Sequence, residues 1–272
     1  MDVATVDLWS TSGDSYLHRA TPTAKVLATA LLLAAVVIVQ NLLIVAAVFV
    51  LVLALARRSG LPLGKLLLGA LYPAIFAVLF AIAQFNGGFI VPLTIIAKAV
   101  TAASVVLLLI ATTPYPRLFA VFALVLPSVV VDVLYTTYRS VFILLRCLGD
   151  SFTALRLRGG LTGRGLLRRG RNVAAALALS VLHAFEVSER TYAVMQLRGY
   201  SGRISGERPG RPTASDLPLL VLAAVVAAAA VAWRYGWRWL NPYSWLPVAA
   251  ALLALAVAMF VPVRSRSPEA RP

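Results

Sequence analysis

The sequence predicts an all-α integral membrane protein with about six transmembrane helices and long amphipathic helices on the cytoplasmic side. The first observation is composition: 61% of the 272 residues are hydrophobic and 13% are charged, whereas roughly a quarter of the residues in soluble domains are charged. The mean hydropathy is +0.88. The second is that several apolar stretches approach the roughly 20 residues that a helix needs to cross a bilayer. The third is a central region that alternates apolar and charged residues at helical spacing.

Turn-forming residues divide the apolar stretches into spans. The first stretch is too long for one span, and the Gln40-Asn41 pair inside it indicates a tight turn. The glycines of "FNGG" (85–88) and the prolines of "TTPYPR" (112–117) separate the next spans from their neighbours. The predicted spans lie near residues 24–40, 42–56, 66–85, 89–111, 217–233 and 245–262 of a single membrane domain, 1–272.

A central unit, 118–200, differs from the spans because charges recur along it. We expect an amphipathic helix over 128–158. Asp132, Arg139 and Arg146 follow one another at seven-residue spacing, which places them on one face of that helix. Valine, leucine and phenylalanine fill the other face, as is typical of a helix that lies along or slopes through a membrane interface.

A second amphipathic helix is expected over 173–198, after a Gly-Arg connection at 159–172. Its first half is nearly all alanine, leucine and valine, and polar residues gather in its second half. Glu186 and Arg190 there form a favourable i,i+4 pair with the acid first. Charges at this density argue against a helix that faces lipid.

The charge distribution predicts which side of the membrane each loop occupies. The net charge is +15, and the stretch 139–211 holds thirteen arginines against four acidic residues. Because basic loops stay in the cytoplasm, we place both termini, the loop 57–65 and the central unit on that side of the cell membrane. The linker 234–245 conflicts with this, since it puts Arg234 and Arg238 outside. The expected partner of the basic charge is the lipid bilayer; a nucleic acid is not expected, because no soluble domain is present to bind it.

The residues that catalysis or metal binding would need are scattered. His18 and His183 are far apart in sequence, whereas a metal site needs three or four converging ligands. No Gly-rich loop ends in Lys-Ser or Lys-Thr, so we expect no ATP site of the P-loop type. We therefore expect no catalytic residue, no metal site and no cofactor in this chain. Lys98, midway along the fourth predicted span, is either functional or paired inside the protein, with Asp132 as one candidate partner.

Two Leu-Arg-Gly sequences end the two amphipathic helices. A glycine after a helix commonly caps it, and an arginine in the last turn suits the helix dipole, so each sequence is explained as an ordinary helix end. Their repetition on one side of the membrane supports a second interpretation, in which each arginine makes bidentate bonds to carboxylates of a partner. The two sequences are Leu157-Arg158-Gly159 and Leu197-Arg198-Gly199.

These motifs resemble those of the transmembrane T component of energy-coupling factor (ECF) transporters, of the cobalt/nickel (CbiQ-like) type, over roughly residues 16–235. "HRATPTAKVL" (18–27) is similar to the family's motif before the first span, and "TYRSVFILL" (137–145) to its first coupling helix. "ALRLRGG" (154–160) resembles the first Arg-Gly signature and "SERTYAVMQLRGYSG" (188–202) the second. Where the family usually has alanine before each signature arginine, this chain has leucine. The last span is not matched.

The resemblance implies a scaffold that is not itself an enzyme. The two signatures would dock into two cytoplasmic ABC ATPase subunits, which hold ATP and Mg²⁺, and the membrane helices would hold a substrate-capture subunit. ATP-driven motion of the ATPases would then drive import of a micronutrient, cobalt or nickel first, into a prokaryotic cell. The residues that would support the coupling helices are Arg139, Glu186, Glu189 and Arg190.

Other functions stay open. A vitamin-type T component is the nearest alternative, since a separate subunit would capture the substrate. A stand-alone secondary transporter would need broken midplane helices and inverted repeats, and no repeat relates the two halves of the sequence. A membrane-embedded enzyme would need clustered histidine, aspartate or glutamate, and the ten acidic residues are scattered.

Overall fold

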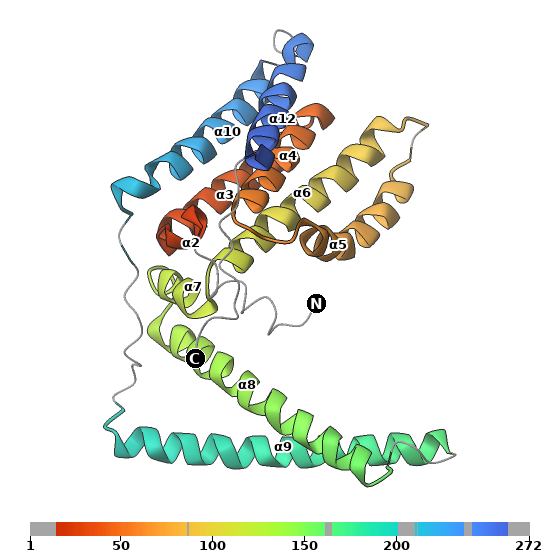
Figure 1. The fold of residues 1–272 in the computed structure, drawn as a ribbon, viewed down its shortest axis with the longest axis vertical. Coiled ribbons are helices and arrows are strands. Elements are labelled where there is room, and N and C mark those ends of the chain that lie inside the picture. Colours follow the sequence, from red (N-terminus) through yellow and green to blue (C-terminus); the bar gives the residue numbers. More distant parts are fainter. Residues whose placement is uncertain are drawn as a thin grey trace. The chain divides into compact units, whose positions relative to one another are not determined.

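The computed structural model describes residues 15–85, 87–160, 165–200, 210, 212–236 and 241–260, and every regular element among them is helical (Figure 1). The all-helical prediction is therefore confirmed for these residues. The chain forms two compact units. The first unit comprises Met1–Val121 and Arg208–Pro272, and the second comprises Phe122–Glu207.

The helices of the first unit follow the apolar stretches of the sequence, and most are bounded by proline, glycine or asparagine. Two short 3₁₀ turns, η1 (Ala214–Asp216) and η2 (Asn241–Tyr243), precede the last two helices. The helices are α2 (Tyr16–Arg19), α3 (Pro22–Ile38), α4 (Leu42–Arg58), α5 (Leu63–Ala83), α6 (Ile90–Thr112), α7 (Tyr115–Phe122), α10 (Leu217–Tyr235) and α12 (Trp245–Phe260).

The predicted turn at Gln40-Asn41 is confirmed, because no helix covers residues 39–41. Asn41 caps α4: its side-chain oxygen accepts a hydrogen bond from the backbone N–H of Leu43 at 2.9 Å. Its amide nitrogen donates to the side-chain oxygen of Asn241, also at 2.9 Å. The turn between α3 and α4 therefore lies beside the connection between α10 and α12.

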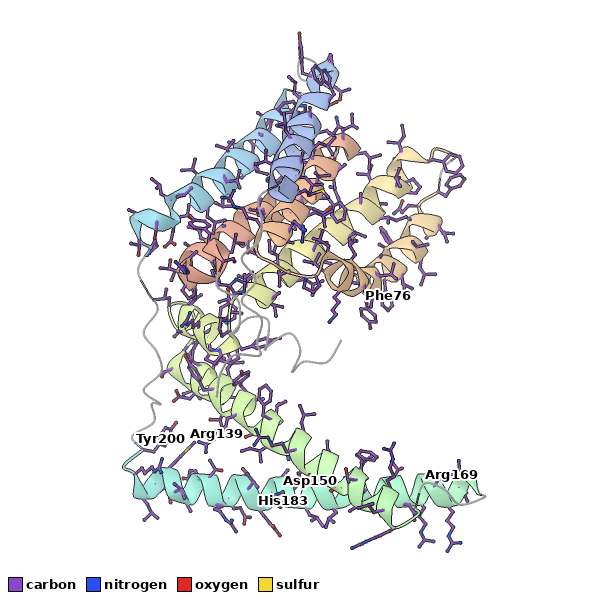
Figure 2. The ribbon with its side chains drawn as sticks, in the orientation of Figure 1. Phe76, Arg139, Asp150, Arg169, His183 and Tyr200 are labelled. Atoms are coloured by element: carbon purple, nitrogen blue, oxygen red, sulfur yellow. The ribbon has the colours of Figure 1, made fainter. Side chains whose placement is uncertain are left out.

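Packing in the first unit pairs early helices with late ones. α10 packs against α3 and α12 against α4, while α6 contacts α3, α4 and α5. α5 packs against α6 and buries small residues such as Ala70 and Ala74, and it turns large side chains such as Phe76 outward (Figure 2). An outward apolar face of this kind suits a bilayer, whose lipid tails are as apolar as the side chains.

Two lysines in this unit cap the C-terminal ends of neighbouring helices. The ammonium of Lys25 donates to the carbonyl of Thr112, the last residue of α6, at 3.0 Å. The ammonium of Lys98 donates to the carbonyl of Val37, in the last turn of α3, at 3.1 Å. Carbonyls at helix ends lack partners within their own helix and attract cations. The partner that the structure shows for Lys98 is thus a backbone carbonyl.

The start of α3 is tied to the start of α10 by Asp216, which is 1% exposed. Its carboxylate accepts hydrogen bonds from the backbone N–H of Thr21 at 3.1 Å and from the Thr21 hydroxyl at 2.6 Å. It also accepts from the N–H of Thr213 at 2.9 Å, which closes a capping box at η1. This junction gives the polar side chain of Thr21, directly before the first long helix, a buried partner.

Five helical stretches are long and apolar enough to cross a membrane, by length and composition: Leu63–Ala83, Ile90–Thr112, Ser128–Leu157, Ala214–Tyr235 and Asn241–Met259. Four of them cover predicted spans. The helices over the other two predicted spans, α3 and α4, have 17 residues each and are about 26 Å long at 1.5 Å per residue. The fifth stretch was predicted as an amphipathic helix.

The second unit contains two long helices, α8 (Ser128–Leu157) and α9 (Leu166–Leu197). α8 has the predicted bounds to within one residue. α9 begins seven residues before the predicted start at 173, so the prediction of a Gly-Arg connection through 172 is wrong for its second half. Leucine and arginine are good helix formers, and in this stretch they outweigh Gly170.

Candidate functional site

α8 and α9 form the hairpin in which the candidate site lies. Along α9 the less exposed side chains are mostly small and recur every three or four residues, which marks one face of the helix. Within this unit α9 contacts α8, so this face packs against α8 and the opposite face is exposed. The residues of the packed face are Asn172, Ala176, Ser180, Ala184, Val187, Thr191 and Met195.

The first signature forms the C-terminal cap of α8. Arg158 is the cap residue, and Gly159 after it has a φ of +68°. The N–H of Gly160 donates to the carbonyl of Leu155 at 2.9 Å, and the N–H of Gly159 donates to the carbonyl of Arg156 at 3.0 Å. Together these two bonds form a Schellman motif, which satisfies two carbonyls that the helix itself leaves without partners.

Gly160, the second glycine of this signature, has a steric role. A Cβ at this position would lie 2.7 Å from Cδ1 of Leu155 and 3.2 Å from its carbonyl oxygen. The carbonyl of Gly160 also accepts a hydrogen bond from the side-chain amide of Asn172, at 3.0 Å. The cap of α8 is therefore held to α9 as well as closed on itself.

The second signature forms the same cap at the end of α9. The N–H of Tyr200 donates to the carbonyl of Met195 at 3.0 Å, and the N–H of Gly199 donates to that of Gln196 at 3.0 Å. Gly199 has a φ of +74°, and no atom lies within 4 Å of a Cβ built on it. Its backbone conformation alone explains the glycine. The two signatures thus share one three-dimensional structure as well as one sequence.

At each cap, the side chains of one leucine and one arginine are exposed. Leu157 is 84% exposed and Leu197 is 88% exposed, and both Arg158 and Arg198 are exposed. A single exposed leucine is ordinary. The same exposed pair on two identical caps indicates a shared role for the two ends, and a guanidinium beside an apolar side chain suits a protein groove that contains a carboxylate.

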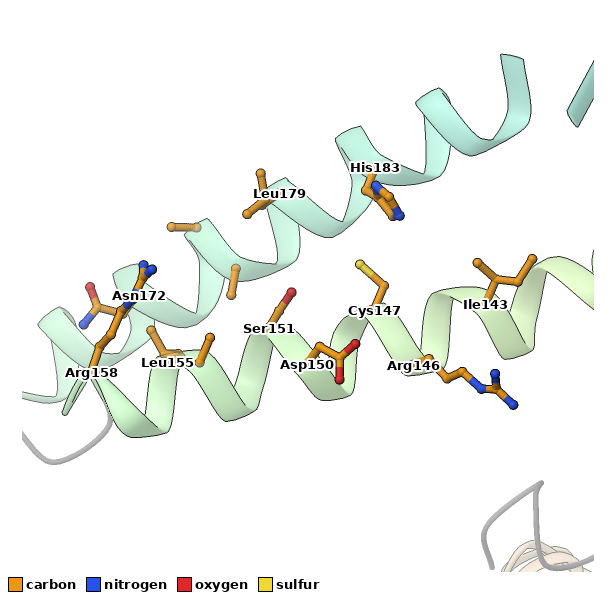
Figure 3. A pocket seen from close by; sticks show the side chains of 13 residues that line it. Ile143, Arg146, Cys147, Asp150, Ser151, Leu155, Arg158, Asn172, Leu179 and His183 are labelled. Carbon is orange, nitrogen blue, oxygen red and sulfur yellow. The ribbon is translucent and has the colours of Figure 1, made fainter. Parts of the chain in front are cut away.

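An open crevice of about 760 Å³ lies between the two helices. Figure 3 shows Arg158 and Asn172 at one end of it and Ile143 and His183 toward the other. Cys147 lines the α8 side. Among the residues that the structure describes, no three or more His, Cys, Asp or Glu side chains gather closely enough to hold a metal ion.

The predicted supporting residues lie along the same hairpin. Arg139 lines a hollow of about 410 Å³ on α8. On α9, Glu186 lies 3.7 Å from Nδ1 of His183, one turn earlier, whereas the predicted pair with Arg190 does not form in the described part of the chain. Glu189 and Arg190 are exposed, so these two charged side chains lie outside the face of α9 that packs against α8.

Sequence reasoning missed the contacts between the two helices. Asn172 was placed in a connection, although it holds the cap of α8. Tyr200 was noted only as part of a motif, although its phenol donates to the carboxylate of Asp132 at 3.2 Å. No local signal predicts this bond, because the residue after a capping glycine often packs back on its own helix, whereas the Tyr200 phenol meets α8.

The family model of the cobalt transport protein, CbiQ, matches residues 13–209 of the chain. This match includes both signatures and all of α8 and α9. A search of curated proteins found no match.

Proposed function

The chain belongs to the cobalt transport protein family, and on that premise we propose that it is the transmembrane coupling subunit of an energy-coupling factor ABC importer. Its two capped ends dock on two cytoplasmic ATPase subunits, which bind ATP and Mg²⁺. Its membrane helices hold a capture subunit for cobalt or nickel. The chain itself catalyses no reaction, needs no cofactor, and lies in a prokaryotic cell membrane with both termini in the cytoplasm.

The observation that carries this proposal is the pair of identical caps, each with an exposed leucine and arginine. The cap of α8 is held at Asn172 of α9, and the other cap ends α9 at Arg198. Asn172 and Arg198 are 26 positions apart along the chain, which sets the caps about 39 Å apart at 1.5 Å per residue. The cap of α8, held against α9, and the cap at the end of α9 thus form two docking points at a spacing that suits two separate subunits.

The docking proposal is tested by removing the two arginines. The chain carries an affinity tag and is co-expressed with the ATPase and capture-subunit genes that neighbour its own. We expect the double variant Arg158→Ala/Arg198→Ala to lose co-purification of the ATPases, because charge-assisted bidentate bonds to buried carboxylates are lost. Arg58→Ala is the matched control, since it removes an exposed arginine at the end of α4, outside the two caps and the hairpin.

Two results would overturn the proposal. One is a double variant that binds the ATPases and supports cobalt uptake as well as the unchanged chain. The other is cobalt uptake by the purified chain alone in proteoliposomes, which would favour a stand-alone transporter. Uptake of a vitamin in place of cobalt would contradict the metal assignment while leaving the coupling role intact.

A further inference from the structure

A hydrogen bond between residues far apart in sequence joins the open ends of the hairpin. The phenol of Tyr200 donates to Oδ2 of Asp132 at 3.2 Å, across 68 positions. Asp132 is 7% exposed and lies in the second turn of α8. Figure 2 shows Tyr200 at the C-terminal end of α9. The bond therefore ties the end of one helix to the beginning of the other.

Tyr200 belongs to the cap that presents Arg198. Two backbone hydrogen bonds close that cap, one of them from the N–H of Tyr200 itself. Because a Schellman motif holds the cap residue and the two that follow in one geometry, Arg198 and Tyr200 cannot move independently. A displacement of Arg198 should therefore also move Tyr200, two residues later in the chain. The phenol of Tyr200 contacts α8 directly.

The protonation state of the phenol suits this contact. Partial desolvation, the hydrogen bond to Asp132 and the charge of that carboxylate all raise the pKa of Tyr200. A raised pKa keeps the phenol protonated at and well above neutral pH, so it remains a donor to the carboxylate.

The other cap is held across the hairpin in a similar way. There the carbonyl of Gly160, which occupies the same position in its cap as Tyr200 does in the second, accepts from Asn172 of α9. Each cap is thus bonded to the opposite helix at the second residue after its arginine. The two bonds close the hairpin at both ends.

We propose that the Tyr200–Asp132 bond is the contact through which the second docking end moves the beginning of α8. This inference rests on the proposed docking function. Asp132 lies ten residues after the end of α7 along the chain, so motion at this point acts on the part of α8 nearest in sequence to the membrane helices. Tyr200 and Asp132 are positioning residues, which act through the helices that they join.

A distance measurement tests the bond in the chain alone. Spin labels are placed on exposed positions of the two helices, Val129→Cys and Gln196→Cys, in a background in which Cys147 is replaced by serine. In lipid nanodiscs, Tyr200→Phe should lengthen and broaden the distance between labels. Tyr192→Phe, which makes the same change at an exposed tyrosine of α9, should leave it unchanged.

Transport by the assembled complex tests the coupling. We expect Tyr200→Phe to keep the ATPases bound and to lower cobalt imported per ATP hydrolysed by about twofold to tenfold, the range expected for one lost hydrogen bond. In an Asp132→Ala background the same change should have no further effect, because the partner is already absent. Asp132→Ala by itself also removes this hydrogen bond, from the acceptor side, and is therefore a second test of it.

The outcomes separate this inference from the docking proposal. If Tyr200→Phe alters neither the label distance nor the import per ATP, the coupling role is wrong. If it releases the ATPases, Tyr200 is a docking residue and the role is wrong as stated. If the unchanged chain binds no ATPase while the label distance still responds to Tyr200→Phe, the docking proposal fails and the bond alone stands.

Discussion

At the scale of single residues, Lys25 illustrates how a charge is accommodated among apolar helices. Its ammonium donates to the carbonyl of Thr112 at 3.0 Å, and the lysine is 4% exposed. Lys98 makes a similar bond to Val37 from a less buried position. Each lysine donates to a carbonyl at a helix end that would otherwise lack a partner. These bonds offset the free-energy cost of placing a charged side chain in the membrane.

Lys25→Met should therefore destabilise the protein. The change keeps the length of the side chain but leaves the buried carbonyl of Thr112 without a donor, at a cost of about 1–3 kcal/mol. For a chain of this size that corresponds to a fall in Tm of roughly 2–4 °C per kcal/mol, measured by thermal unfolding in detergent. Lys98→Met is the comparison and should cost less. Equal Tm values for the two variants would contradict this account.

The glycines of the signatures are explained by backbone geometry, and Gly199 gives the cleanest test. Its φ is +74° and the space around it is empty, so Gly199→Ala should cost about 1 kcal/mol through backbone strain alone. Gly199→Asn should cost less, because asparagine tolerates this conformation. We expect faster amide exchange over 194–200 for the alanine variant.

Gly149 supplies the control for that measurement. It lies within α8, no atom lies within 4 Å of a Cβ built on it, and it has no positive φ. Gly149→Ala should therefore be neutral or stabilise α8 by up to about 1 kcal/mol, since alanine favours the helix. If both alanine variants are equally stable, the positive φ is not the reason for Gly199.

At the scale of elements, the two ends of α9 differ in charge. Among the residues that the structure describes, five exposed arginines gather around the first cap, and the sequence has no acidic residue between Asp150 and Glu186. In the described part of the chain near the second cap, two glutamates balance two arginines. The arginines at the first cap are Arg156, Arg158, Arg168, Arg169 and Arg171, and the charges near the second are Glu186, Glu189, Arg190 and Arg198.

This difference predicts unequal salt dependence of docking. Arg198→Ala leaves only the first cap to bind the ATPases, and Arg158→Ala leaves only the second. Because salt screens exposed charges, binding by the first cap alone should weaken more steeply between 50 mM and 500 mM NaCl. The measurement is the amount of ATPase that co-purifies at each concentration. Parallel losses for the two variants would show that the surrounding arginines do not take part.

The elements also show what sequence patterns can predict. The break at Gln40-Asn41 and the bounds of α8 were predicted correctly, because turn residues and apolar runs act locally. The start of α9 was placed seven residues late, since the five glycines and four arginines of 159–172 suggested a loop. There the helix propensity of leucine and arginine prevailed. Local patterns succeed where one signal dominates and fail where two compete.

At the scale of the whole molecule, the contacts between distant residues were out of reach of the sequence. Periodicity assigns a residue to a face of its helix, but it does not say which helix that face meets. The bonds of Asp216 to Thr21 and of Tyr200 to Asp132 each join residues far apart along the chain. The two Leu-Arg-Gly signatures were recognisable because each is local, whereas the contacts that hold them to the neighbouring helix were not.

The whole chain should support cobalt import by the assembled transporter without binding the ion itself. Its described part brings no three metal-binding side chains together, and stable cobalt sites need several converging nitrogen, oxygen or sulfur ligands. Titration calorimetry of the purified chain with Co²⁺ should therefore give no saturable heat at micromolar metal. His183→Ala, which removes the imidazole beside Glu186, should leave cobalt uptake by the complete transporter unchanged.

Under the proposed function the ion binds to a separate capture subunit, which therefore provides the positive control. Purified alone, it should give saturable binding under the conditions in which the chain gives none. Stoichiometric Co²⁺ binding by the chain that disappears in His183→Ala would contradict the prediction and would place the ion in the α8–α9 crevice, which His183 lines. Unchanged binding in that variant would also contradict the prediction and would place the ion at a site that does not use His183.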